Sequence, residues 1–432
     1  MHGVHPSQVD WEIELRRQYR QAQEFLVSLA NRHFGGDRSR VVVVPGNHDV
    51  CYPDVIASVS PVGATAGSAG LPQYSHELSE THSTLRWSWH DLSFFRVSDS
   101  TKYNARFRYF AEMFEEFYAG VRIYSQDPSQ QVTLYDYPDL GVSVVGLNSC
   151  YNNDPYRRAG SIHPTAIASA CDAMLSSSRD GWLKIAVWHH NCAGGPLQED
   201  YVDPAFLQHL IDCGVSLGFH GHQHMHDCFD EKYRFGPSPR KITVISAGTL
   251  CAEPRSLRPG IPRSYNVVEV DEALWRGTVH QRQMINSMFN MPIWGPGHFS
   301  STGRPQAEFS IDQPQRRRPA GLDTRLTLEK IDRLTAEARW DDVVDRVASV
   351  KDNEVARRYL ANALEHLDSP PRTIKELWPP LTPQEAVILG NAILVDGTKE
   401  QATSFLSLEI VSTSSDASIA EIARRIRERV LR

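Results

Sequence analysis

Three short, mainly apolar runs in this chain are each followed within four residues by histidine. VVVV at 41–44 is followed by PGNHD, LKIAV at 183–187 by WHHN, and VSLGF at 215–219 by HGHQHMHD. Short apolar runs predict buried strands, and ligand sites in α/β sheets gather at the carboxyl ends of such strands. The chain is therefore expected to fold so that loops from distant parts of the sequence meet at one site.

The first 286 residues are expected to form one mixed α/β domain. Further strands are predicted at 131–138, 141–149, 241–248 and 264–271, and helices at 8–33 and 164–177. Residues 52–130 combine loops that contain Pro and Gly with an aromatic-rich stretch. We interpret this region as a cap inserted between core strands, where it would shape access to a site.

The composition and periodicity of the sequence change between this domain and the end of the chain. Residues 287–321 are rich in Pro, Gly and polar residues and have no periodicity, which predicts a linker. Residues 322–432 contain amphipathic helical patterns with Ser, Thr, Asp or Asn near their starts. We expect an all-α domain here, either a small bundle or a repeat-like array that binds a protein partner.

Charge and cysteine usage narrow the class of protein. The chain has 45 Lys and Arg against 52 Asp and Glu, a net charge of -7, which gives no general attraction to nucleic acid or to an anionic membrane. The seven cysteines are scattered singly, so neither a disulfide framework nor a thiolate zinc site is indicated. No run approaches the roughly 20 apolar residues that span a bilayer. These features predict a soluble, cytoplasmic protein.

The histidines at the strand ends predict a metal site, because neutral imidazole is the commonest side-chain ligand of transition metals. GNHD alone would be read as a turn, since Gly, Asn and Asp are common turn residues. Three strand ends that carry imidazoles favour convergence on one ion. His190, His220 and His226 are expected to be packing or surface residues beside such a site.

The ordered set GNHD, then a strand-end His, then GHxH resembles the calcineurin-like metallophosphoesterases. The residues that carry the resemblance are Gly46, Asn47, His48 and Asp49, then His189, then Gly221, His222 and His224, within roughly residues 10–285. The resemblance implies an αββα four-layer sandwich with two sheets face to face. It also implies two metal ions bridged by a carboxylate, with Asn47, His189 and His222 on one ion and His224 on the other.

The chemistry of these side chains agrees with the roles that the resemblance implies. His48 is expected to hydrogen-bond a phosphoryl oxygen or protonate the leaving alkoxide, since imidazole titrates near neutral pH. Asp49 is expected to accept a hydrogen bond from His48 and fix its orientation. With no Cys in the set, the N and O donors suit Mn, Fe, Zn or Ni.

The sequence departs from the family pattern before GNHD. Family members open with a strand bearing Asp-x-His and a second strand ending in Gly-Asp, and no apolar strand run that could carry either motif precedes the helix predicted at 8–33. These motifs supply the bridging aspartate and most ligands of one ion, so the chain by itself is expected to bind one ion or none. We favour the interpretation that the chain as given is truncated. The alternatives are a degenerate domain, or a second polypeptide that supplies the missing strands and otherwise leaves open sheet edges.

Two functions follow from these alternatives. The first is a metal-dependent phosphoesterase that hydrolyses a phosphomonoester or a phosphodiester with metal-activated water. The second is a non-catalytic, phosphoesterase-like binding or scaffold protein that acts through its C-terminal helical domain. Because the two motifs are missing, both functions stay open for the chain as given.

Overall fold

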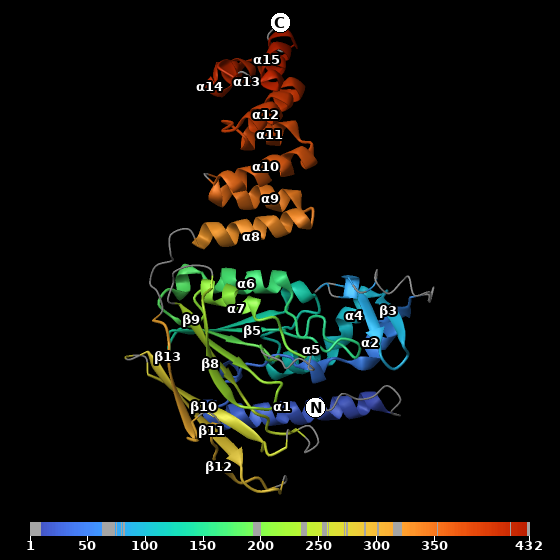
Figure 1. Cartoon of the computed structure of the whole chain (residues 1–432), viewed down its shortest axis with the longest axis vertical. Coiled ribbons are helices and arrows are strands. Elements are labelled where there is room, and N and C mark those ends of the chain that lie inside the picture. The colour runs from blue at the N-terminus through green and yellow to red at the C-terminus, as the bar shows by residue number, and fades with distance from the viewer. Residues whose placement is uncertain are drawn as a thin grey trace. The chain divides into compact units, whose positions relative to one another are not determined.

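The computed structural model of the 432-residue chain forms two compact units, Met1–Arg317 and Arg318–Arg432 (Figure 1). The first unit is mixed α/β, and the described residues of the second form helices and their connections, as the sequence predicts. The structure describes residues 10–62, 74, 76–78, 80, 83–192, 200–234, 240–252, 257, 259–271, 273, 275–288, 291–299, 302–313, 322–351, 353–414 and 416–429.

A six-stranded sheet in the order β4-β5-β6-β7-β9-β8 is the centre of the first unit. Its strands are β4 (Val132–Tyr137), β5 (Val142–Leu147), β6 (Leu183–Val187), β7 (Leu217–His220), β8 (Asp227–Lys232) and β9 (Lys241–Ser246). Strands β5, β6, β7 and β9 run parallel, and β4 and β8 pair antiparallel at the two edges. The carboxyl ends of the parallel strands therefore lie along one side of the sheet.

Two helices contact this sheet on the side that Figure 1 shows above it. Helix α6 (Pro164–Met174) packs against β4 and β5, and α7 (Ala205–Asp212) packs against β9. The ring of His163 caps α6 by accepting a hydrogen bond from the backbone N–H of Thr165. α6 confirms the helix predicted at 164–177, whereas α7 gave no clear signal in the sequence.

A second sheet packs against the central one. Its strands are β10 (Ser264–Asp271), β11 (Arg276–Met284), β12 (Trp294–Pro296) and β13 (Gln306–Ser310). β11 pairs antiparallel with β10 on one side and with β12 and β13 on the other. Val279 and Phe309 from this sheet share a buried apolar cluster with Leu217 and Ile245 of the central sheet.

The predicted linker at 287–321 is wrong for the residues that form β12 and β13. Both strands are short and lie at the same edge of the second sheet, where Gly295 and Pro296 are tolerated because an edge strand needs fewer ladder hydrogen bonds. Strands of this length leave too little alternation in the sequence to be recognised. Residues 314–321 of the predicted linker lie outside the described residues.

A long helix and a short aromatic one form a further core with the central sheet. Helix α1 (Trp11–Phe34) confirms the helix predicted at 8–33 within the described residues, and it packs against α5 (Arg108–Phe117). Phe114 of α5 and Tyr19 of α1 are buried in one cluster with Tyr135 of β4. Although α5 falls within the predicted cap at 52–130, it therefore belongs to the core of the unit.

The strand predicted at 41–44 is wrong in the described structure. Val41 has extended backbone, but the segment has no strand partner among the described residues. Its side chains are used for packing instead. A Cβ added at Gly146 of β5 would lie 2.9 Å from Cγ1 of Val44, so the segment lies directly on that strand. β-Branched residues favour extended backbone, but only a neighbouring strand makes a ladder.

The remaining part of the predicted cap forms a small separate sheet with helices. Its strands β1 (Val59–Pro61), β2 (Leu85–Ser88) and β3 (Ser93–Val97) pair antiparallel in the order β1-β3-β2. Helices α2 (Tyr52–Ser58) and α4 (Ser100–Asn104) lie beside it. These three strands were not predicted, because the sequence of this region suggested loops and an aromatic-rich stretch.

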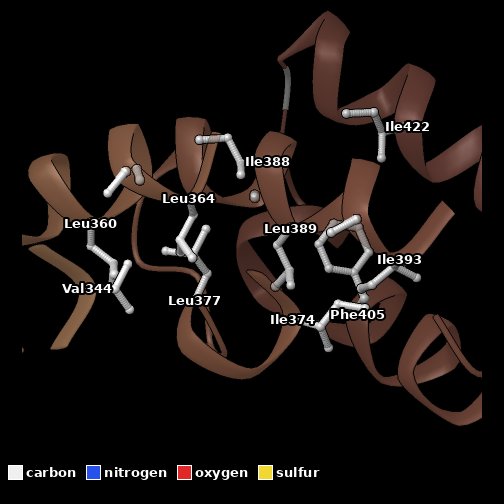
Figure 2. Packing of buried hydrophobic residues seen from close by; sticks show 14 of the residues in the cluster. Val344, Leu360, Leu364, Ile374, Leu377, Ile388, Leu389, Ile393, Phe405 and Ile422 are labelled. Carbon is white, nitrogen blue, oxygen red and sulfur yellow. The ribbon is translucent and has the colours of Figure 1, made fainter. Parts of the chain in front are cut away.

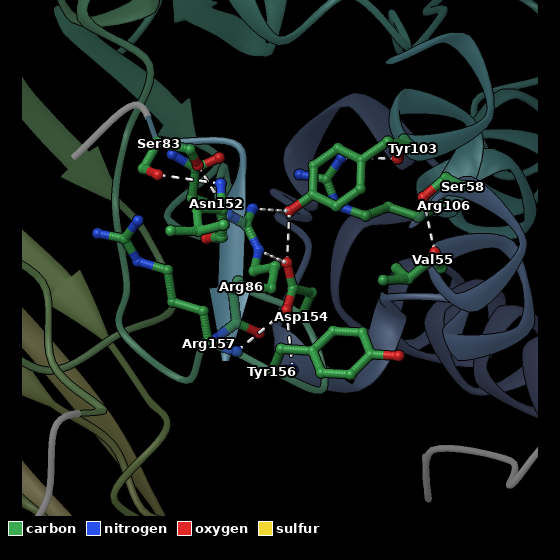
Figure 3. Close-up of polar contacts among 12 residues, drawn as sticks. Val55, Ser58, Ser83, Arg86, Tyr103, Arg106, Asn152, Asp154, Tyr156 and Arg157 are labelled. Atoms are coloured by element: carbon green, nitrogen blue, oxygen red, sulfur yellow. Dashed lines mark hydrogen bonds and ion pairs between the residues drawn. The ribbon is translucent and has the colours of Figure 1, made fainter. Parts of the chain in front are cut away.

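A buried polar network joins the cap to the loop after β5 (Figure 3). The carboxylate of Asp154 accepts hydrogen bonds from Nε of Arg86 at 2.6 Å and from the hydroxyl of Tyr103 at 2.7 Å. Its other oxygen accepts from the backbone N–H groups of Tyr156 and Arg157. The Arg86 and Asp154 side chains are almost completely buried, so each charge depends on the other.

The second unit is held together by one continuous apolar cluster (Figure 2). Its helices are α8 (Leu322–Ala336), α9 (Trp340–Val347), α10 (Glu354–Leu367), α11 (Pro370–Glu376), α12 (Pro383–Asp396), α13 (Lys399–Ser407), α14 (Glu409–Ser412) and α15 (Ala417–Arg429). Leu364, Leu389 and Phe405 pack in this core. A buried bidentate pair of Arg357 with Glu385 joins α10 to α12. Among the described helices of the chain, none is both long enough and apolar enough to cross a bilayer.

We expect Asp154→Ala to lower the free energy of unfolding of the first unit by about 3–5 kcal/mol, because it leaves the buried Arg86 guanidinium unpaired. Urea unfolding followed by tryptophan fluorescence measures the change. Asp139→Ala is the matched control, since Asp139 pairs with Arg40 at the surface and should cost under about 1 kcal/mol. Equal effects of the two substitutions would show that the buried network does not stabilise the unit.

Candidate metal centre

The end of β6 places two histidines on a fixed backbone. The hydroxyl of Ser149, which follows β5, accepts hydrogen bonds from the backbone N–H groups of His189 at 3.1 Å and His190 at 2.9 Å. The same hydroxyl lies 3.0 Å from Nδ1 of His190, whose ring is completely buried. His190 is therefore a packing residue, as the sequence predicts. The ring of its neighbour His189 lies against the side chain of Asn47.

The end of β7 holds its histidines in an unusual backbone conformation. His222 has φ 70° and His224 has φ 55°, both in the left-handed region that residues with a side chain seldom adopt. The backbone N–H of Gly221 donates to the carbonyl of His189, which ties this loop to the end of β6. Left-handed residues cost energy and are concentrated at functional sites, so this loop is a candidate for function on backbone geometry alone.

The GNHD motif forms a short 3-10 turn, η2 (Asn47–Asp49). Asp49 holds the turn in place, because one carboxylate oxygen accepts from the backbone N–H of Gly46 at 2.7 Å and the other from the hydroxyl of Tyr19 at 2.9 Å. That Asp49 orients His48 stays a prediction. The contact of Asp49 with Tyr19 was not predicted, because it depends on the packing of α1 near the turn, which the spacing of the motif cannot reveal.

Three of the predicted ligands meet at these strand ends. Oδ1 of Asn47 lies 2.7 Å from Nε2 of His189, and Nε2 of His189 lies 3.2 Å from Nδ1 of His222. The rings of His189 and His222 are 5.0 Å apart and nearly perpendicular. Donor atoms about 2.1 Å from one ion in tetrahedral geometry lie about 3.4 Å from each other, so a slight opening of this cluster would admit an ion.

The other two predicted site residues lie beside this cluster. His48 is exposed on η2 and close enough that its charge would lower the pKa of His189. His224 is half-buried, and its charge would lower the pKa of His222 in the same way. The two short contacts of the cluster join Asn47 to His189 and His189 to His222.

Burial keeps the imidazoles of the cluster neutral. It lowers the pKa of His189 and His190 well below 6.5, with further lowering by the surrounding histidines. Burial also lowers the pKa of His222 and lowers that of His220 to about 4. A metal ion binds the neutral imidazole, so these side chains are in the protonation state that a metal centre requires.

Small residues allow the close approach of these rings. A Cβ at Gly46 would lie 2.9 Å from Nδ1 and Cε1 of His189, and one at Gly160 would lie 2.6 Å from the ring of His190. Ser149 and Tyr19 are further supporting residues that sequence reasoning missed. Ser149 follows a predicted strand and could have been found by that rule, whereas Tyr19 had no signal beyond its place on a helix.

The donor set is compatible with a divalent transition metal. It consists of one amide oxygen and two neutral imidazole nitrogens, which suits Mn, Fe, Zn or Ni. Among the described residues, no group of three or more His, Cys, Asp or Glu side chains is arranged to hold an ion. Among the described residues, the cluster therefore has three metal donors only when the amide oxygen of Asn47 is counted with the two imidazoles.

A scan against models of protein families finds none that matches the chain, and a search of curated proteins finds no match either. Any function proposed for the chain accordingly rests on the residues and geometry of its strand ends.

We expect Gly46→Ala to destabilise the first unit by about 1–3 kcal/mol, because the added methyl group would force the His189 ring from its position. Gly221→Ala is the matched control, since its Cβ would enter open space within the same site. Urea unfolding measures both. An equal loss in the two variants would show that the contact of Gly46 with His189 is not tight.

We expect the free energy of unfolding of the metal-free protein to fall as the pH is lowered from 7 to 5.5. The pKa of His189 and of His190 lies below the unfolded value of 6.5, so the unfolded chain takes up protons that the folded chain does not. Each such histidine contributes up to about 1.4 kcal/mol per pH unit below 6.5. Urea unfolding of wild type and His190→Gln tests this, since the variant should show the weaker dependence. A stability that is constant over this range would contradict the burial of neutral imidazoles.

Proposed function

We propose that this chain is a metal-dependent phosphoesterase of the calcineurin-like metallophosphoesterase type. The observation that carries the proposal is the meeting of Asn47, His189 and His222 at 2.7 and 3.2 Å. These residues come from three segments widely separated in sequence, and each follows an apolar run. A chance cluster of packing histidines would not require that each donor lie at the end of such a run.

The arrangement of layers supports the same proposal. Helices α6 and α7 contact the central sheet, and β11 and β13 of the second sheet share a buried apolar cluster with it. A helical layer and two packed sheets are three of the four layers of an αββα sandwich. In such a fold the site would lie at the carboxyl ends of the central strands, where ligand sites of α/β sheets gather.

Each candidate residue would have its own role. Asn47, His189 and His222 would hold one divalent ion, and His224 would bind a second only together with ligands that the missing motifs supply in the family. Such an ion, when bound, polarises a phosphoryl oxygen and lowers the pKa of bound water. The exposed imidazole of His48 would hydrogen-bond a phosphoryl oxygen and donate its proton to the leaving oxygen of the ester.

The second unit favours an additional role in binding a protein partner. It has an apolar core of its own, and arrays of paired helices present extended surfaces to partners. In the alternative function, this helical unit would carry the activity and the first unit would be a non-catalytic module. For either function we propose a cytoplasmic location, because singly scattered cysteines are typical of reducing compartments.

Metal content and turnover together test the proposal. We expect the full chain, supplied with Mn²⁺ or Zn²⁺, to retain metal after desalting and to hydrolyse p-nitrophenyl phosphate or bis-p-nitrophenyl phosphate. His189→Ala should lose the metal together with the activity. His48→Ala should retain the metal and lose about 10²–10⁴-fold in kcat, because proton transfer contributes that much and His48 is not a ligand.

His90→Ala is the matched control for His48→Ala. His90 is also an exposed imidazole, but it lies in the turn between β2 and β3 of the cap, so its loss should change neither metal content nor kcat. A wild-type chain that retains no metal and hydrolyses neither ester would favour the non-catalytic alternative.

A further inference from the structure

A carboxylate faces the second ring nitrogen of His222. Oδ2 of Asp200 lies 3.4 Å from Nε2 of His222, and the amide nitrogen of Gln223 lies 3.4 Å from the other oxygen of Asp200. Nε2 of His222 is buried and makes no hydrogen bond among the described residues, so the carboxylate of Asp200 is the charged group that this nitrogen faces. Asp200 precedes α7 and is about 20 residues from His222 in sequence, so only the fold brings them together.

The two nitrogens of His222 thus face different surroundings. Nδ1 points to His189 and the candidate metal centre, whereas Nε2 points to Asp200. A neutral imidazole carries its proton on one nitrogen only, and a carboxylate attracts that proton to the nitrogen it faces. The position of Asp200 therefore favours a proton on Nε2 and leaves the lone pair of Nδ1 free toward Asn47 and His189.

Asp200 cannot share an ion with Nδ1 of His222, because the two nitrogens of one ring point in different directions. The pair of Asp200 and His222 is also not a simple surface ion pair. The side chain of His222 is 10% exposed and that of Asp200 is 30% exposed, so the pair is partly shielded from water. In the described part of the chain, Asp200 is the one carboxylate paired with any of the three donors Asn47, His189 and His222.

We propose that Asp200 is a positioning residue of the metal centre: it fixes the tautomer and the orientation of His222 so that Nδ1 is presented to the ion. The proposal rests on the proposed function, because it requires that the cluster bind a metal. Carboxylates that accept a hydrogen bond from a metal-bound histidine typically contribute about 10–100-fold to metal affinity. The left-handed backbone of His222 acts in the same direction, since it restricts where the ring can point.

The test compares Co²⁺ binding by the full chain and by Asp200→Leu, which removes the acceptor but keeps the same branching of the side chain. After removal of metal by a chelator, Co²⁺ is titrated against a chromophoric competitor. We expect Asp200→Leu to bind Co²⁺ about 10–100-fold more weakly than wild type. Asp200→Glu should recover most of the affinity, because it restores the carboxylate. The ¹⁵N shifts of labelled histidine in the metal-free protein should show His222 protonated on Nε2 in wild type and as a mixture of tautomers in Asp200→Leu.

Asp180→Leu is the matched control, because Asp180 lies before the opposite end of β6 and is exposed. It should bind Co²⁺ as wild type does. If wild type takes up no Co²⁺, the metal centre itself is overturned, and the role of Asp200 with it. If wild type binds Co²⁺ and Asp200→Leu binds it equally well with the same His222 tautomer, only the role of Asp200 is overturned.

Discussion

The parallel pairing of β5, β6 and β7 is the constraint on which the rest of the first unit depends. Parallel strands end on the same side of a sheet, so the residues after each of them become neighbours although they are far apart in sequence. Ser149, at the end of β5, uses one hydroxyl to fix the backbone of both His189 and His190. The loop after β7 is tied to the same place through the carbonyl of His189. The histidine cluster is thus a consequence of strand direction combined with a few hydrogen bonds.

Close packing then fixes the positions of the histidine rings and of the turn that carries Asn47. Gly46 and Gly160 lie against imidazole rings at distances that no larger residue could tolerate without movement of the ring. Tyr19 reaches from α1 to Asp49 and so couples a helix at the surface to the turn that carries Asn47. Gly160 and Tyr19 lie outside the short motifs that carry the donors, whereas Gly46 is the first residue of GNHD. A substitution at a supporting residue can therefore alter the site without touching a donor atom.

Long apolar runs and strong helical periodicity were sufficient to predict much of the fold. The helix α1, the helix α6 and strands β4, β5, β6, β7, β9 and β10 lie where the sequence places them. The failures share a physical cause. Residues 41–44 have the composition of a buried strand, yet pairing depends on a neighbour that composition does not specify. The opposite error occurred at β12 and β13, which are strands that the sequence did not predict. Strands of three and five residues at an edge are stabilised by the neighbouring strand β11 and not by their own sequence.

The sequence by itself determined which side chains could serve as donors and that each follows an apolar run, because hydrophobic periodicity and residue chemistry are local properties. These properties predicted that the strand-end histidines would converge on one site, and the family resemblance implied that Asn47, His189 and His222 would share one ion. Only the tertiary structure decided what surrounds them. That Asp49 contacts Tyr19, and that Asp200 faces His222, follows from the packing of a helix and a loop against the strand ends. Such contacts join residues with no fixed spacing in the chain, so no local pattern encodes them.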